Sequence, residues 1–91
     1  MYKVDISPDA KKHLEVHKKS GQEIVMKRID RIFKELKLHP ESGIGKPKKL
    51  KNDPQERWSR RIDKKKRMTY QINENEVIVL VISAKGHYDD K

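Results

Sequence analysis

Residues 57–70 alternate between large apolar and polar side chains on either side of a short charged turn. The larger apolar side chains stand at even positions, Trp58 and Ile62 before the turn and Met68 and Tyr70 after it. Successive side chains of a β-strand point to opposite faces, so these four residues should share one buried face. Two alternating runs joined by a short turn predict a β-hairpin, and we expect the rest of the chain to fold around it.

The opposite face of the predicted hairpin carries two arginines, Arg61 and Arg67, together with Ser59 and Thr69. An arginine stays charged, and its planar group can bind two oxygens of one phosphate. The pattern therefore predicts a phosphate site on this face. The alternative is a pair of surface arginines bonded to carboxylates such as Asp63.

Two other hairpin residues, Trp58 and Arg60, share the inward positions. A tryptophan can stack on an RNA base. Its alternation with Ile62 and Tyr70 instead predicts that Trp58 belongs to the core. Arg60 should be partly buried or at the sheet edge, and ion-paired.

The chain before the hairpin begins with a predicted strand and helix. Residues 1–6 alternate and predict a strand with one apolar face. Ser7 and Pro8 predict a helix start, because serine caps helices and proline is favoured at the first helical position. The weakly apolar face of this helix would consist of Ala10, Leu14 and either His17 or Val16.

A stronger apolar periodicity predicts a second, amphipathic helix. Ser20 and Glu23, three residues apart, predict a capping box at its start. Pro40 ends it, because the residue before a proline avoids the helical conformation. The stripe facing the sheet would consist of Ile24, Val25, Ile29, Ile32, Phe33 and Leu36.

The remaining segments predict a long loop and a buried strand. Residues 41–56 contain two glycines, two prolines and little periodicity, so they predict a loop in which Leu50 anchors the chain to the core. Residues 76–83 are almost wholly apolar and predict a central strand buried on both faces. Strand, helix, helix, loop and three antiparallel strands give an α+β fold, one domain over residues 1–91 with a single sheet covered by two helices.

The net charge of +9 is concentrated around the hairpin. Residues 46–67 carry eleven of the 23 basic and three of the 14 acidic groups, a net charge of +8. Such a patch favours nucleic acid or an acidic protein as partner. The alternative is a solvated, lysine-rich face.

Cysteine is absent, which excludes disulfides, thiolate catalysis and cysteine zinc sites. His13 and His17, four residues apart, could meet one metal ion, but nothing else supplies ligands at a recognisable spacing, so we predict no metal. No apolar run could span a bilayer and no signal-peptide pattern opens the chain, so we expect a cytoplasmic protein without membrane contact.

Four motifs occur together and in order over nearly the whole chain. They are GIGKP at 43–47 with LK at 50–51, WSRRI at 58–62, RMTY at 67–70 and HY at 87–88. With the two-helix opening, this set resembles the YoeB branch of the RelE/ParE toxin superfamily. The resemblance implies the RelE-like fold and an mRNA interferase, a toxin that cuts mRNA in the ribosomal A site.

The resemblance also implies roles for individual residues. In the family, the ribose 2′-OH attacks the adjacent phosphate, and neither a metal nor another cofactor is required. Arg61 and Arg67 would stabilise the phosphate, and His87 would be the general acid, helped by Tyr88. The residues expected to bind RNA are Lys46, Lys49, Lys51, Arg57 and Lys65.

Lys48 departs from the family pattern. The family's usual general base is a glutamate directly after the G-K-P proline, and here that position is Lys48. A lysine would act there as a charge, with His87 taking both proton transfers in turn, or activity would be weak. Two alternatives stay open: a non-catalytic homologue that binds RNA or the ribosome, and a ParE-like toxin that acts on DNA gyrase.

The resemblance implies a protein partner as well. An acidic, YefM-like antitoxin would lie across the basic face and neutralise the toxin. The assembly would be a homodimer or a toxin–antitoxin hetero-oligomer.

Overall fold

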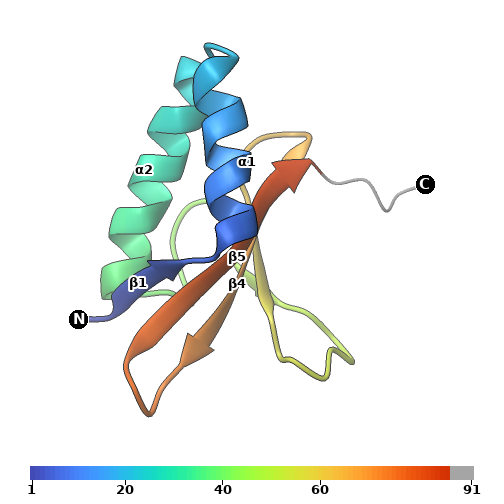
Figure 1. Ribbon diagram of the computed structural model, residues 1–91. Coiled ribbons are helices and arrows are strands. Elements are labelled where there is room, and N and C mark those ends of the chain that lie inside the picture. The colour runs from blue at the N-terminus through green and yellow to red at the C-terminus, as the bar shows by residue number, and fades with distance from the viewer. Residues whose placement is uncertain (87–91) are drawn as a thin grey trace.

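The computed structural model describes residues 1–86, and Figure 1 shows two helices on one side of a single β-sheet. In chain order the elements are β1 (Lys3–Ile6), α1 (Pro8–Lys19), α2 (Glu23–Leu38), β2 (Lys48–Lys49), β3 (Trp58–Arg61), β4 (Lys66–Asn73) and β5 (Ile78–Gly86). The α+β order predicted from the sequence is therefore confirmed. His87 and Tyr88, which were predicted to belong to the site, lie outside the described residues.

The five strands form one mixed sheet in the order β1-β5-β4-β3-β2. β1 runs parallel to β5, and the other neighbouring pairs are antiparallel. The predicted loop contains the two-residue strand β2, which pairs with β3 and so places the loop next to it.

The core lies between the helices and the sheet. The hairpin residues predicted to face inward, Ile62, Met68 and Tyr70, are completely buried, and Trp58 is half-buried against them. The inward stripe of α2 is confirmed for Val25, Ile29, Ile32 and Leu36, with Phe33 half-buried. Of the two residues proposed to face inward near the end of α1, His17 is buried and Val16 is exposed.

Three details of the helical prediction were tested. Ser7 caps α1 as predicted, its hydroxyl accepting a hydrogen bond from the Ala10 amide at 3.1 Å. The predicted capping box was wrong. Because α1 extends through residue 19, the Ser20 hydroxyl donates back to the Val16 carbonyl. Helix α2 begins after Gln22 and has no side-chain cap. The prediction that Ile24 faces the sheet was also wrong, because this residue lies in the first turn of α2 and is 80% exposed.

Two predictions about buried segments were also wrong. β5 is interior to the sheet, but only one of its faces is covered: Val79 and Val81 are buried, whereas Leu80 points to the open face and is exposed. Leu50 is half-buried outside the main core, and Ile44 packs against the core in its place. No helix within residues 1–86 is long and apolar enough to cross a bilayer.

The end of β5 is held by α1. β1 stops at Ile6, so the backbone of β5 beyond residue 81 lacks a strand partner on that side. His17 Nε2 lies 2.6 Å from the Ala84 carbonyl, and the Ala84 amide donates to His13 Nδ1 at 3.2 Å. The two histidines thus replace the missing strand and fix the segment that leads to residues 87 and 88.

Candidate functional site

A pocket of about 490 Å³ lies on the open face of the sheet, between the loop and the hairpin. Its lining comes from two segments, 45–50 and 59–69. The lining residues are Gly45, Lys46, Lys48, Leu50, Ser59, Arg61, Arg67 and Thr69. Four residues predicted for the site, two lysines and two arginines, are therefore brought together.

The strand register explains how the arginines meet. Arg61 of β3 and Arg67 of β4 are direct Cα partners, as are Ser59 and Thr69. Opposed residues of an antiparallel pair extend from the same face of the sheet. The predicted polar face of the hairpin is thus one wall of the pocket.

The loop forms the other wall through its contacts with β3. The Arg61 amide donates to the Gly45 carbonyl at 2.7 Å, and Lys48 pairs with Ser59 across β2 and β3. Gly45 has a φ of +83°, and a Cβ there would overlap the Arg61 carbonyl oxygen. Glycine therefore permits the close approach of loop and strand.

The lining is cationic. None of the eight lining residues carries a carboxylate. The alternative partner for the arginines, Asp63, instead accepts hydrogen bonds from the Lys65 and Lys66 amides at 2.8 and 2.7 Å. Partial burial opposes ionisation of Asp63, but these donors and the Lys66 ammonium outweigh it and lower its pKa. Asp63 therefore bonds within the turn, and no ion pair within residues 1–86 occupies Arg61 or Arg67.

The other predicted RNA-binding residues do not line this pocket, and Lys49 lines a different hollow. The Arg57 guanidinium is held by the nearly buried Asp53, with Nε 2.8 Å from Oδ2. The Lys49 ammonium lies 3.2 Å from a Glu56 carboxylate oxygen. Lys51, in the loop, and Lys65, at the hairpin turn, are exposed.

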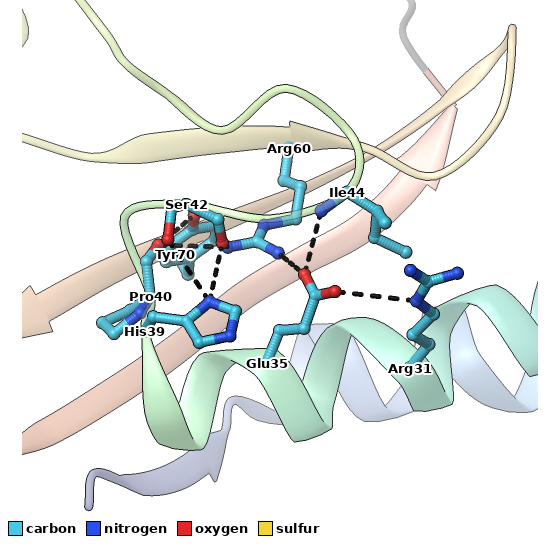
Figure 2. A network of polar contacts seen from close by, with 8 residues as sticks. All are labelled: Arg31, Glu35, His39, Pro40, Ser42, Ile44, Arg60 and Tyr70. Atoms are coloured by element: carbon cyan, nitrogen blue, oxygen red, sulfur yellow. Dashed lines mark hydrogen bonds and ion pairs between the residues drawn. The ribbon is translucent and has the colours of Figure 1, made fainter.

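Sequence reasoning missed the partner of Arg60. The side chain is fully buried and its Nη1 lies 2.6 Å from Oε1 of Glu35 on α2 (Figure 2). The predicted pairing of Arg60 is confirmed, but the side chain is more deeply buried than predicted, and its partner is 25 residues away in the chain. The one signal that could have pointed to it is an acidic residue, Glu35, beside the buried stripe of α2.

A larger hollow, of about 660 Å³, lies at the opposite end of β4, near the turn to β5. Its lining includes the carboxylates of Asp5, Glu41, Glu56, Glu74 and Glu76. Such a surface repels phosphate, so the cationic pocket is the better candidate for the site. Among the residues that the structure describes, no three His, Asp or Glu side chains form a group that could hold a metal ion.

Comparison with known proteins identifies the family of this chain. Residues 7–88 match the model of the "YoeB-like toxin of bacterial type II toxin-antitoxin system". The chain is 36% identical to Toxin YoeB of Streptomyces coelicolor over 73 residues, which cover 80% of this chain and 84% of that protein.

Two solved structures share the fold over almost their whole length. The "YoeB/ParE toxin from Agrobacterium tumefaciens" superimposes with a TM-score of 0.85 at 27% identity, covering 94% of this chain and 99% of that one. The toxin in a "heterotetrameric complex of YoeB-YefM toxin-antitoxin from Staphylococcus aureus" gives 0.78 at 28% identity, covering 97% and 99%. The chain therefore belongs to the YoeB-like toxins of bacterial type II toxin–antitoxin systems, a family of ribosome-dependent mRNA endoribonucleases.

Proposed function

We propose that this toxin cleaves ribosome-bound mRNA in the cationic pocket, with Arg61 and Arg67 binding the scissile phosphate. The observation that carries the proposal is the direct pairing of the two arginines in a pocket whose lining, within residues 1–86, contains no carboxylate. Negative charge grows on the phosphate oxygens as the ribose 2′-OH attacks phosphorus. Charged donors placed beforehand stabilise that charge.

We propose that His87 and Tyr88 carry out the proton transfers. We assign His87 as the general acid that protonates the leaving 5′-oxygen, with Tyr88 assisting. The reaction needs no metal in this scheme, because the arginines neutralise the phosphate, and cationic side chains do not attract a divalent metal ion.

Lys48 distinguishes this toxin from the family's usual pattern. It lines the pocket with Arg61 and Arg67, at the position where a glutamate would act as base. An ammonium group in a cationic pocket binds phosphate but does not accept a proton. We therefore assign Lys48 to phosphate binding and His87 to both proton transfers, and we expect slower cleavage than a glutamate would give.

The cationic pocket also suits the antitoxin. The related Staphylococcus aureus toxin is found in a complex with YefM. We propose that an acidic segment of a YefM-like antitoxin covers Arg61, Arg67 and Lys48, which blocks the phosphate site directly. Charge reversal at Arg67 should weaken that complex, and calorimetric titration with a purified YefM-like antitoxin would measure it.

The decisive experiment maps mRNA cleavage on translating ribosomes. Wild-type protein should give cuts in phase with codons, and an mRNA carrying a 2′-deoxy sugar at the cut site should resist cleavage there. His87→Ala should abolish the cuts, and Arg67→Gln should make them much slower. Absence of phased cuts with the wild-type protein would refute the nuclease assignment.

Lys48 favours one other function, a non-catalytic binder of RNA or the ribosome. Such a protein would block translation without cutting mRNA. Its binding would retain the salt dependence of phosphate contacts, and Arg67→Gln would lower the slope of log affinity against log salt by about one. Translation arrest with intact mRNA would identify this case.

A further inference from the structure

A buried arginine and a carboxylate tie the loop to the helix beneath it (Figure 2). Besides Glu35, the Arg60 guanidinium binds two loop carbonyls: its Nη2 donates to Ser42 at 2.8 Å and to Pro40 at 3.2 Å. The Tyr70 hydroxyl donates to the same Pro40 carbonyl at 2.8 Å. One side chain of β3 therefore contacts both the end of α2 and the loop that follows it.

Glu35 completes the attachment from the helix side. Its Oε1, which accepts from Arg60, also accepts from the Ile44 amide at 3.0 Å. Its Oε2 lies 3.6 Å from Nε of Arg31 on the same helix. A Cβ on Gly43 would overlap the Glu35 carboxylate, so the loop passes directly over the ion pair. Backbone groups at positions 40, 42 and 44 are thus all held by two side chains.

The pair is poorly suited to stabilising the fold alone. Nε of Arg60 is buried and has no hydrogen-bond partner within residues 1–86. Burying the Arg60 charge completely and the Glu35 charge largely is costly, and apolar residues of similar volume often replace buried ion pairs without loss of stability. Apolar residues could not bind a carboxylate and two carbonyls from one rigid plane, as an arginine does.

The loop held in this way leads straight into the pocket. After Ile44, the Gly45 carbonyl accepts from the Arg61 amide, and Lys46 and Lys48 then line the cationic wall. Arg60 and Arg61 are adjacent on β3 and point to opposite faces, so one anchors the loop from below while the other faces the phosphate site. The position of the loop wall relative to the arginine wall depends on this anchor.

We infer that Arg60 and Glu35 are positioning residues, whose ion pair fixes the loop so that Lys46 and Lys48 face Arg61 and Arg67 at the spacing a phosphate requires. The inference rests on the proposed function in taking this pocket as the phosphate site. Neither residue lines the pocket, so they act through the loop and not on the RNA.

The test uses Arg60→Lys and Glu35→Gln, with Asp30→Asn as the matched control. Lysine keeps the charge but cannot bind all three acceptors, and glutamine keeps the shape without the charge. Asp30 pairs with Lys34 on the same helix, but both side chains are exposed.

Amide hydrogen exchange reports the position of the loop without any need for activity. We expect exchange at Ile44 and Arg61 to quicken by about tenfold in both variants, with Val81 in the core unchanged, because the opening is local. Inorganic phosphate, titrated against the side-chain resonances of Arg61 and Arg67, should bind more weakly in both. The double variant should add little to either single change, because both act on one loop.

The kinetics of mRNA cleavage provide a further test of the positioning role. At saturating ribosomes the single-turnover rate should fall by about 10- to 100-fold with ribosome affinity unchanged, because misplacement by about 1 Å is that costly. Equal quickening at Val81 and Ile44, or unchanged phosphate affinity, would show a purely structural role and overturn the inference. If the wild-type protein does not cleave mRNA, the proposed function fails, while exchange and phosphate binding still decide the positioning role.

Discussion

Arg61 and Arg67 are direct partners across β3 and β4, so two like charges extend side by side from one face of the sheet. Like charges directly opposite each other weaken a strand pair. Neither arginine has an ion-pair partner among the residues described that would offset the repulsion. This arrangement weakens the hairpin and becomes favourable when an anion binds between the two groups.

Replacing either arginine should therefore separate activity from stability. For Arg61→Gln and Arg67→Gln we expect cleavage to fall by about 10²- to 10³-fold, the usual loss for a removed transition-state donor. The free energy of unfolding should stay level or rise by about 0.2–1 kcal/mol as the repulsion is relieved. Urea unfolding and cleavage rates check both halves, and a marked loss of stability in either variant would contradict the arrangement.

Lys48→Glu should increase cleavage. The change restores a proton acceptor in the pocket, and general base catalysis contributes about 10²- to 10⁴-fold. Lys11→Glu, an equal charge change on the exposed surface of α1, is the control for altered net charge. Single-turnover rates on programmed ribosomes are the measurement. An unchanged rate would mean that proton abstraction does not limit the reaction or does not occur at this position.

The hairpin was predictable because a strand's alternation is local. Residues 58, 62, 68 and 70 share a face whatever the rest of the chain does, and that alone placed Arg61 beside Arg67 on the other face. The α2 stripe was predictable for the same reason. The prediction for Ile24 was wrong because a helical period shows which residues share a face but not where the contact with the sheet begins.

The loop was harder because nothing periodic orders it. Leu50 and Ile44 are similar apolar residues in one long segment. Ile44 packs against the core, and its amide is held by the Glu35 carboxylate that pairs with Arg60. That pairing joins residues 25 positions apart, which no local pattern encodes. The sequence thus named residues that meet in the candidate site, while long-range contacts set the geometry of its loop wall.

His13 should make stability depend on pH. Partial burial lowers its pKa below the ordinary 6.5, and nearby Lys85 and His17 lower it further against the opposing effect of Asp9. Neutral Nδ1 accepts from the Ala84 amide, so folding favours the unprotonated ring. The unfolded chain then binds more protons below pH 6.5, and stability conferred by His13 is lost as pH falls from 6.5 through the lowered pKa.

The measurement is urea unfolding between about pH 5 and 8, a range that spans the ordinary histidine pKa. His13→Asn is the reference, because the amide oxygen can accept from the Ala84 amide but does not titrate. The difference in unfolding free energy between the two proteins should be constant above pH 6.5 and shrink below it. A difference that stays constant across the range would exclude His13 as the titrating group.

Gly45→Ala should disrupt the pocket, whereas Gly21→Ala should not. Both glycines have positive φ, +83° and +70°, so alanine pays about 1 kcal/mol of backbone strain at either position. A Cβ at Gly21 meets nothing within 4 Å, but at Gly45 it would overlap the Arg61 carbonyl oxygen and lie 2.6 Å from Cγ of Arg60. Because backbone cannot yield as a side-chain end can, the loop must move away from β3.

We expect Gly45→Ala to lose cleavage and to lose about 1–3 kcal/mol more unfolding free energy than Gly21→Ala, as overpacking does. Equal losses in the two variants would show that loop and strand do not approach this closely in solution.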